Sequence, residues 1–239
     1  MAIRTARRPS AATVKPADQR VTSWLDRVVP LSGVVFAVLA MGGYLVIDEF
    51  PDSDTPVSAL TSYYAAHHAQ VARGGMLLAY SVIFFILFGV AVWARMRRTG
   101  GPPVLAGAVL VATAVFAADG LNSAGTYAML GDIGADPTTT PGALQAWHIF
   151  GAIGHPTVDI LTLLLAVAAA GIFARAFPRW LAWSALVLVA LSFTPFSFYG
   201  FLLFHLWVLL AGIALAVRPG IPRPARTQPE PSGALPHTV

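Results

Sequence analysis

The chain has 239 residues, of which 56% are hydrophobic and 11% are charged, and its mean hydropathy is +0.69. A soluble domain carries about 25% charged residues, so this composition excludes a soluble globule and predicts an all-α membrane protein surrounded by a lipid bilayer. The chain has no cysteine, which excludes disulfides, thiolate zinc sites and iron–sulfur clusters. Its basic residues form no nucleic-acid-binding motif, so we expect no nucleic-acid partner.

Apolar stretches taken in chain order predict six transmembrane helices, because most of them approach the ~20 residues that cross a bilayer. Residues 1–28 contain no such stretch and are expected to form a flexible cytoplasmic arm. Six prolines and few apolar residues in 218–239 favour a disordered cytoplasmic tail. The transmembrane domain between these two segments, 29–217, contains predicted spans at about 29–47, 74–94, 103–124, 150–174, 180–195 and 198–217.

Lysine and arginine are distributed unevenly about the predicted spans. With six spans, every one of the 15 basic residues except Arg73 falls on the same side of the membrane. Under the positive-inside rule that side is the cytoplasm, so both termini are expected there. The single lysine, Lys15, among fourteen arginines is typical of a high-GC bacterial genome, which favours the bacterial cytoplasmic (inner) membrane.

The first outer loop predicts a further helix. Asp54 or Thr55 is suited to cap a helix that has Pro56 at its first position. Apolar and aromatic residues then recur at helical spacing up to Val71. We expect an amphipathic helix that lies on the outer membrane surface and covers the bundle.

Polar side chains inside the spans point to a candidate site. A carboxylate at the centre of a span costs roughly 2.5–3.5 kcal/mol and therefore needs compensation. Counting from the cytoplasmic ends of the spans places the polar residues at similar heights in the outer half of the membrane. We predict that they line an outward-facing pocket that binds a small ligand or ion. The pocket candidates are Asp119, Asn122, His155, Asp159, Tyr199 and His205.

Several other functions fit the same residues. His155 and Asp159 lie four residues apart and therefore on one helix face, with the helix-kinking Pro156 between them. Together with His148 and His205 they supply ligands for a zinc-dependent hydrolase, and the histidines of spans four and six could instead hold haem in an electron carrier. A proton-coupled transporter and a non-catalytic scaffold remain open, as does a purely structural hydrogen-bond network. The sequence predicts no catalytic residue, oligomeric state or protein partner.

Two short segments carry a family resemblance. The sequence Pro-Arg-Trp-Leu-Ala-Trp at 178–183, with Leu-Trp-Val at 206–208, resembles a recurring ending in uncharacterised multi-pass membrane proteins of actinobacteria that carry domain-of-unknown-function labels. The first outer loop is similar too: Asp-Ser-Asp at 52–54 precedes Tyr-Tyr-Ala at 63–65 and His67. The resemblance covers about residues 30–218 and implies a six-span membrane protein without a known activity. His155, Asp159 and His205 are not part of the shared pattern.

Overall fold

The computed structural model describes residues 24–47, 50–153, 178–192, 194 and 197–217, and within these ranges it contains helices and no strand. The predicted tail, residues 1–23 of the predicted N-terminal arm and most of the fourth span lie outside these ranges. Residues 24–28, which were expected to belong to the flexible arm, are instead helical and continuous with the first span, because their apolar side chains extend that span. The elements are η1 (Val29–Leu31), α2 (Ser32–Ile47), α3 (Val57–Arg98), α4 (Pro103–Ala135), α5 (Pro141–Ile153), α7 (Arg179–Ser192) and α8 (Ser197–Val217).

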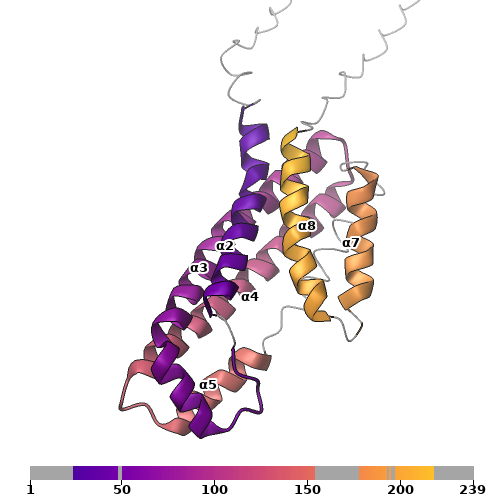
Figure 1. The fold of residues 1–239 in the computed structure, drawn as a ribbon. Helices are drawn as coiled ribbons and strands as arrows, with labels where there is room; N and C mark the ends of the chain where they lie inside the picture. The colour runs from indigo at the N-terminus through magenta and orange to yellow at the C-terminus, as the bar shows by residue number, and fades with distance from the viewer. Residues whose placement is uncertain (1–23, 48–49, 154–177, 193, 195–196, 218–239) are drawn as a thin grey trace, which may run out of the picture.

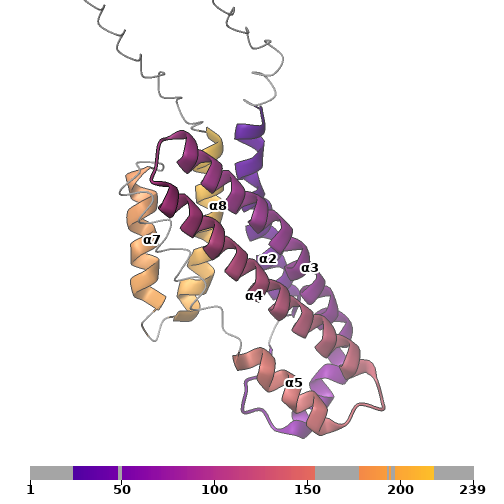
Figure 2. The same cartoon turned by 180° about the vertical axis from the view of Figure 1, so that it is seen from behind.

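The centre of the fold is an antiparallel hairpin of the two longest helices, α3 and α4 (Figures 1 and 2). The sequence Gly-Gly-Pro-Pro at 100–103 accounts for the turn between them. Gly100 has a φ of 73°, and the N–H of Gly101 donates to the carbonyl of Met96 at 3.0 Å, a geometry that commonly ends a helix at glycine. Pro103 opens α4 at a position where no backbone N–H is needed.

Helix α3 has 42 residues and is about 63 Å long, roughly twice the thickness of a bilayer core. The structure does not confirm a separate surface helix in the first outer loop, because the residues predicted for it are continuous with predicted span 74–94. Gly74 and Gly75, which lie at the expected boundary, are buried inside α3 and do not interrupt it. The predicted side-chain cap is also absent: Pro56 itself is the N-cap residue of α3, and it makes no side-chain capping bond.

Helix α2 packs against α3 and α8 through small residues. A Cβ atom added to Gly74 would lie 2.8 Å from the carbonyl oxygen of Gly43, so the two backbones approach closely at this point. On the neighbouring face of α3, a Cβ atom on Gly75 would lie 2.7 Å from the backbone nitrogen of Ala128 in α4. Paired small residues permit this kind of close packing between membrane helices. Gly74 and Gly75 therefore mark the level at which α2 and α4 cross α3.

The remaining helices pack at opposite ends of the hairpin. Helix α7 packs against α8, and the indole N–H of Trp207 joins them by donating to the carbonyl of Leu181 at 3.2 Å. Beyond the end of α2, the hairpin projects past the other helices, and α5 lies across this projecting end (Figure 1). We call the part of the fold formed by 50–73, 125–135 and α5 the projecting end.

Three helices are long and apolar enough to cross a membrane: the continuous helical segment Trp24–Ile47, α3 and α4. Apolar side chains on the outside of the bundle are strongly exposed, for example Leu45 at 75% and Ile83 at 55%, as expected of a lipid-facing surface. Helices α7 and α8 begin within one residue of the predicted spans 180–195 and 198–217. Helix α7 has only 14 residues, and the fully described apolar part of α8 is Leu202–Val217, so neither is counted among the helices long enough to cross. The fold is therefore that of an all-helical membrane protein, and the count of six spans is not confirmed.

Candidate functional site

A small cavity lies inside the bundle between α2, α3, α4 and α8, and its volume is about 40 Å³. Asp119 and Ser123 line it from α4, where their spacing of four residues places both on one helix face. Tyr44 of α2, Ser81 of α3 and His205 of α8 complete its polar lining. Three consecutive helices and α8 thus bring a carboxylate, an imidazole, a phenol and two hydroxyls to one place.

The ring of His205 is held in position by aromatic neighbours. The side chain is 2% exposed, and its ring stacks on Phe36 with the centroids 5.3 Å apart and the planes inclined by 17°. Tyr44 approaches the imidazole from the side, with the ring centroids 6.2 Å apart. Aromatic contacts of this kind restrict how the ring can turn. His205 therefore presents its nitrogen atoms within a fixed plane beside the cavity.

Asp119 places a carboxylate in this apolar bundle. Its Oδ2 atom is buried, and the side chain is near enough to Tyr44 for the two groups to interact electrostatically. The cavity also contains Phe116, one turn before Asp119 on α4, which packs against the ring of Phe204 at 5.3 Å. Neither lipid nor aromatic rings can solvate the charge of a carboxylate, so an acid at this position needs a compensating group such as a proton, a cation or a hydrogen-bond donor.

A second buried histidine, His148, lies in the projecting end. Its side chain is fully buried, and its Nε2–H donates to the backbone carbonyl of Asp52 at 3.0 Å. Because a carbonyl only accepts, the neutral ring has its proton on Nε2, and Nδ1 accepts from the hydroxyl of Tyr64 at 2.9 Å. Phe50 stacks on the same ring with the centroids 5.1 Å apart. His148 thus joins α5 to α3 and to the segment that precedes α3.

The structure brings only some of the predicted pocket residues together. Asp119 and His205 line the same cavity, whereas Asn122 is exposed on α4, where its carbonyl accepts a hydrogen bond from Thr126. Tyr199 belongs to α8, but its side chain is outside the described part of the structure. His155 and Asp159 also lie outside the described residues.

The cavity contains polar residues that the sequence analysis did not select. Tyr44 lies close to the end of a predicted span, where an aromatic residue is ordinarily read as an interfacial anchor. Ser81 donates to the carbonyl of Leu78 within its own helix, a common local bond for a serine in a membrane helix. Only the depth of these residues, at the level of Asp119, could have indicated that they line the same site.

The zinc and haem hypotheses stay predictions. Among the described residues, no three His, Asp or Glu side chains are grouped so that they could hold a metal ion. Both ring nitrogens of His148 have hydrogen-bond partners, so one of these bonds would have to break before His148 could bind zinc or haem iron. Two further ligand candidates, His155 and Asp159, belong to the part of the chain that is not described.

The chain was compared with protein-family models, with curated proteins and with solved structures. None of the three comparisons gave a match. The functional conclusion therefore depends on the geometry of the residues themselves.

Proposed function

We propose that the protein is a multi-pass protein of the bacterial inner membrane that binds a small cation in an outward-facing pocket formed by Asp119, His205 and Tyr44. In this proposal the chain crosses the membrane six times, as the resemblance to actinobacterial membrane proteins implies, and both termini lie in the cytoplasm. Its main support is that a carboxylate with one buried oxygen atom and a buried imidazole line one cavity in a lipid-facing bundle.

The distribution of charge supports this orientation. The start of the first helical segment, the α3–α4 turn and the C-terminal end of α8 lie at the same end of the bundle (Figure 1). Arginines gather at this end, including Arg27 and the group Arg95, Arg97 and Arg98. The projecting end instead contains acids such as Asp132. A cytoplasmic location of the arginine-rich end follows from the positive-inside rule.

The size of the cavity favours a small cation over an organic ligand. Pockets for organic ligands and cofactors usually have volumes of roughly 300–1,000 Å³, whereas this cavity has about 40 Å³. About 10–15 Å³ of such space is enough to hold one water molecule. The space is therefore suited to a proton carried by the side chains, or to one small metal ion such as Na⁺.

The chemistry of the lining residues also favours a cation. The carboxylate of Asp119 supplies negative charge, and the hydroxyls of Ser81 and Ser123 supply neutral oxygen atoms, which are ligands that hard cations prefer. The imidazole of His205 supplies ring nitrogens that can donate or accept a hydrogen bond beside the carboxylate. A proton and a metal ion would both act by neutralising the same carboxylate.

Infrared titration of the full-length protein in liposomes tests the proposal. We expect a carboxylic-acid C=O band that appears as the pH falls and that the Asp119→Asn variant lacks. The control is Asp132→Asn, which removes an exposed acid from the same helix and should keep the band. If added Na⁺ moves the titration to lower pH, the metal ion competes with the proton for the site; if it does not, the proton is the ligand.

Two outcomes would overturn the proposal. The first is a spectrum that is the same in the wild type and in Asp119→Asn at every pH. The second is stoichiometric zinc or a Soret absorption band in the purified protein, because these would indicate the hydrolase or the haem carrier instead. Thermal unfolding of Asp119→Asn serves as the control for folding. We expect its apparent Tm to be equal to or above that of the wild type, because the substitution removes a charge from the bundle.

A further inference from the structure

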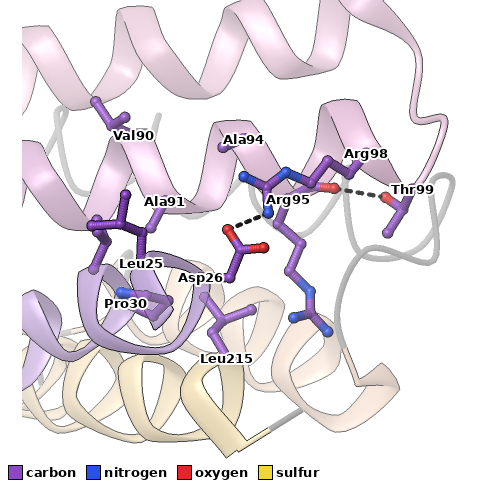
Figure 3. A pocket seen from close by; sticks show the side chains of 11 residues that line it. Leu25, Asp26, Pro30, Val90, Ala91, Ala94, Arg95, Arg98, Thr99 and Leu215 are labelled. Carbon is purple, nitrogen blue, oxygen red and sulfur yellow. Dashed lines mark hydrogen bonds and ion pairs between the residues drawn. The ribbon is translucent and has the colours of Figure 1, made fainter. Parts of the chain in front are cut away.

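The arginine-rich end of the bundle contains a larger cavity, with a volume of about 170 Å³. It lies between the first helical segment, the last turns of α3 and the end of α8, as Figure 3 shows. Seven of its eleven lining residues are apolar, and they include Leu25, Val90, Ala94 and Leu215. The cavity is therefore an apolar cleft between helices, at the level where the helices are expected to leave the membrane.

Charged side chains are part of this cavity. Arg95 and Arg98 are separated by three residues, so they lie on the same face of α3. Asp26 forms an ion pair with Arg98, and the guanidinium of Arg95 points away from that pair (Figure 3). With two arginines and one acid in the lining, the cavity has a net positive charge.

The surroundings indicate contact with lipid. Trp24, Leu25 and Val90 are 61%, 43% and 40% exposed, so apolar surface continues from the cavity to the outside of the bundle. Tryptophan is enriched at the membrane–water interface, and arginine at that depth can reach the headgroups. The same cleft thus offers apolar walls to a hydrocarbon chain and guanidinium groups to an anion.

We propose that this cavity binds one anionic phospholipid from the cytoplasmic leaflet. Its phosphate lies between the guanidinium groups of Arg95 and Arg98, and one acyl chain lies along Leu25, Val90 and Ala94. Arginine suits this role because its planar guanidinium can donate two parallel hydrogen bonds to phosphate oxygens. Basic pockets between transmembrane helices on the cytoplasmic side are suited to anionic headgroups. The site lies near the end of the bundle, away from the Asp119 cavity, and does not depend on the proposed cation binding.

Native mass spectrometry of the full-length protein with added phosphatidylglycerol tests the proposal. The Arg95→Gln variant removes one positive charge from the cavity and leaves both members of the Asp26–Arg98 ion pair in place. We expect it to weaken binding of the lipid about fivefold, which is the contribution typical of one arginine at a membrane surface. The matched control is Arg97→Gln, which removes the same charge from an exposed position beside the cavity and should bind like the wild type.

A second variant tests the apolar part of the site. Ala94→Phe fills the cleft without changing any charge, and it should also weaken binding of phosphatidylglycerol. The proposal is overturned if phosphatidylcholine binds as tightly as phosphatidylglycerol, or if Arg97→Gln loses as much binding as Arg95→Gln. It is likewise overturned if inorganic phosphate displaces the lipid at equal concentration, because a free anion would then be the ligand.

Discussion

His148 and His205 are both buried, but they lie in regions that use a histidine differently. In the projecting end, His148 has one hydrogen bond to the hydroxyl of Tyr64 and one to the backbone of Asp52. In the bundle, His205 faces a cavity that it shares with the carboxylate of Asp119. His148 joins chain segments together, whereas His205 lies beside the carboxylate of Asp119 and a cavity between helices.

This contrast shows that burial alone does not identify a functional histidine. A buried polar group is stable when its hydrogen bonds are satisfied, and a ring with both nitrogens bonded has no need of a ligand. A buried carboxylate beside an imidazole and a cavity can instead change its state of charge by taking up a cation. The following three experiments test whether the projecting end is held by specific hydrogen bonds and the bundle by close backbone packing.

The largest effect is expected for His148→Ala. The substitution leaves a buried void and removes the partners of Tyr64 and of the Asp52 carbonyl, so it should lower the free energy of unfolding by about 3 kcal/mol. For a protein of this size, that corresponds to a fall in apparent Tm of roughly 6–12 °C, measured by thermal unfolding in detergent. The control is His68→Ala, because His68 bonds only locally, to the carbonyl of Ala65 in its own helix. Equal losses in both variants would contradict the structural role of His148.

The next effect tests the packing of the bundle. A Cβ atom on Gly43 would lie 2.9 Å from Cγ of Leu78 and 3.0 Å from the carbonyl oxygen of Gly74, whereas one on the adjacent Gly42 would meet no atom within 4 Å. We expect Gly43→Ala to destabilise the protein by about 1–3 kcal/mol, because α2 and α3 must move apart. Gly42→Ala should be neutral or stabilising by up to ~1 kcal/mol, because alanine favours the helix. Denaturant titration of both variants would refute the close crossing if they behaved alike.

The smallest effect is expected at the loop between α4 and α5. The backbone N–H and the hydroxyl of Thr138 both donate to Asp136, and they lower the pKa of this carboxyl below its ordinary value. Because its pKa is lower in the folded state, Asp136 contributes stability above its unfolded pKa of about 4 and loses that contribution as the pH falls through its folded pKa. The side chain is fully exposed, so the effect is small.

Thermal unfolding between about pH 6 and pH 3 measures this contribution. Asp136→Asn should show a slightly smaller acid-induced fall in apparent Tm than the wild type. Thr138→Ala retains the backbone donor but lacks the hydroxyl, so it should lie between the two. A steeper acid-induced fall in Asp136→Asn than in the wild type would contradict the prediction that ionised Asp136 stabilises the folded state.

The sequence predicted those parts of the fold that depend on local signals. The low charge and the apolar runs predicted membrane helices, and the Gly-Gly-Pro-Pro sequence at 100–103 stands where α3 ends and α4 begins. Helix boundaries were harder to predict where a glycine is explained by packing against another helix. Gly74 and Gly75 resemble a break between two helices in the sequence, but in the fold they are contact points for α2 and α4 inside one helix.

The candidate site shows the same limit. Asp119 and His205 were selected because ionisable residues inside a membrane span are rare and these two lie at similar depths. Depth also selected Asn122, which helical periodicity places on an exposed face of α4. Tyr44 has a similar depth but was not selected, since depth alone does not indicate that α2 packs beside α8. Helix pairing is decided by contacts between segments far apart in sequence, and a single sequence does not contain that information.

The unbroken course of α3 has a mechanical consequence. The close contacts at Gly74 and Gly75 divide the helix into two arms of comparable length. One arm contains Tyr64, which bonds to His148, and the other contains Arg95 and Arg98. Because α3 runs unbroken from Val57 to Arg98, the two arms are joined by helical backbone and not by a loop, so a change at one end can reach the other without crossing a flexible connection.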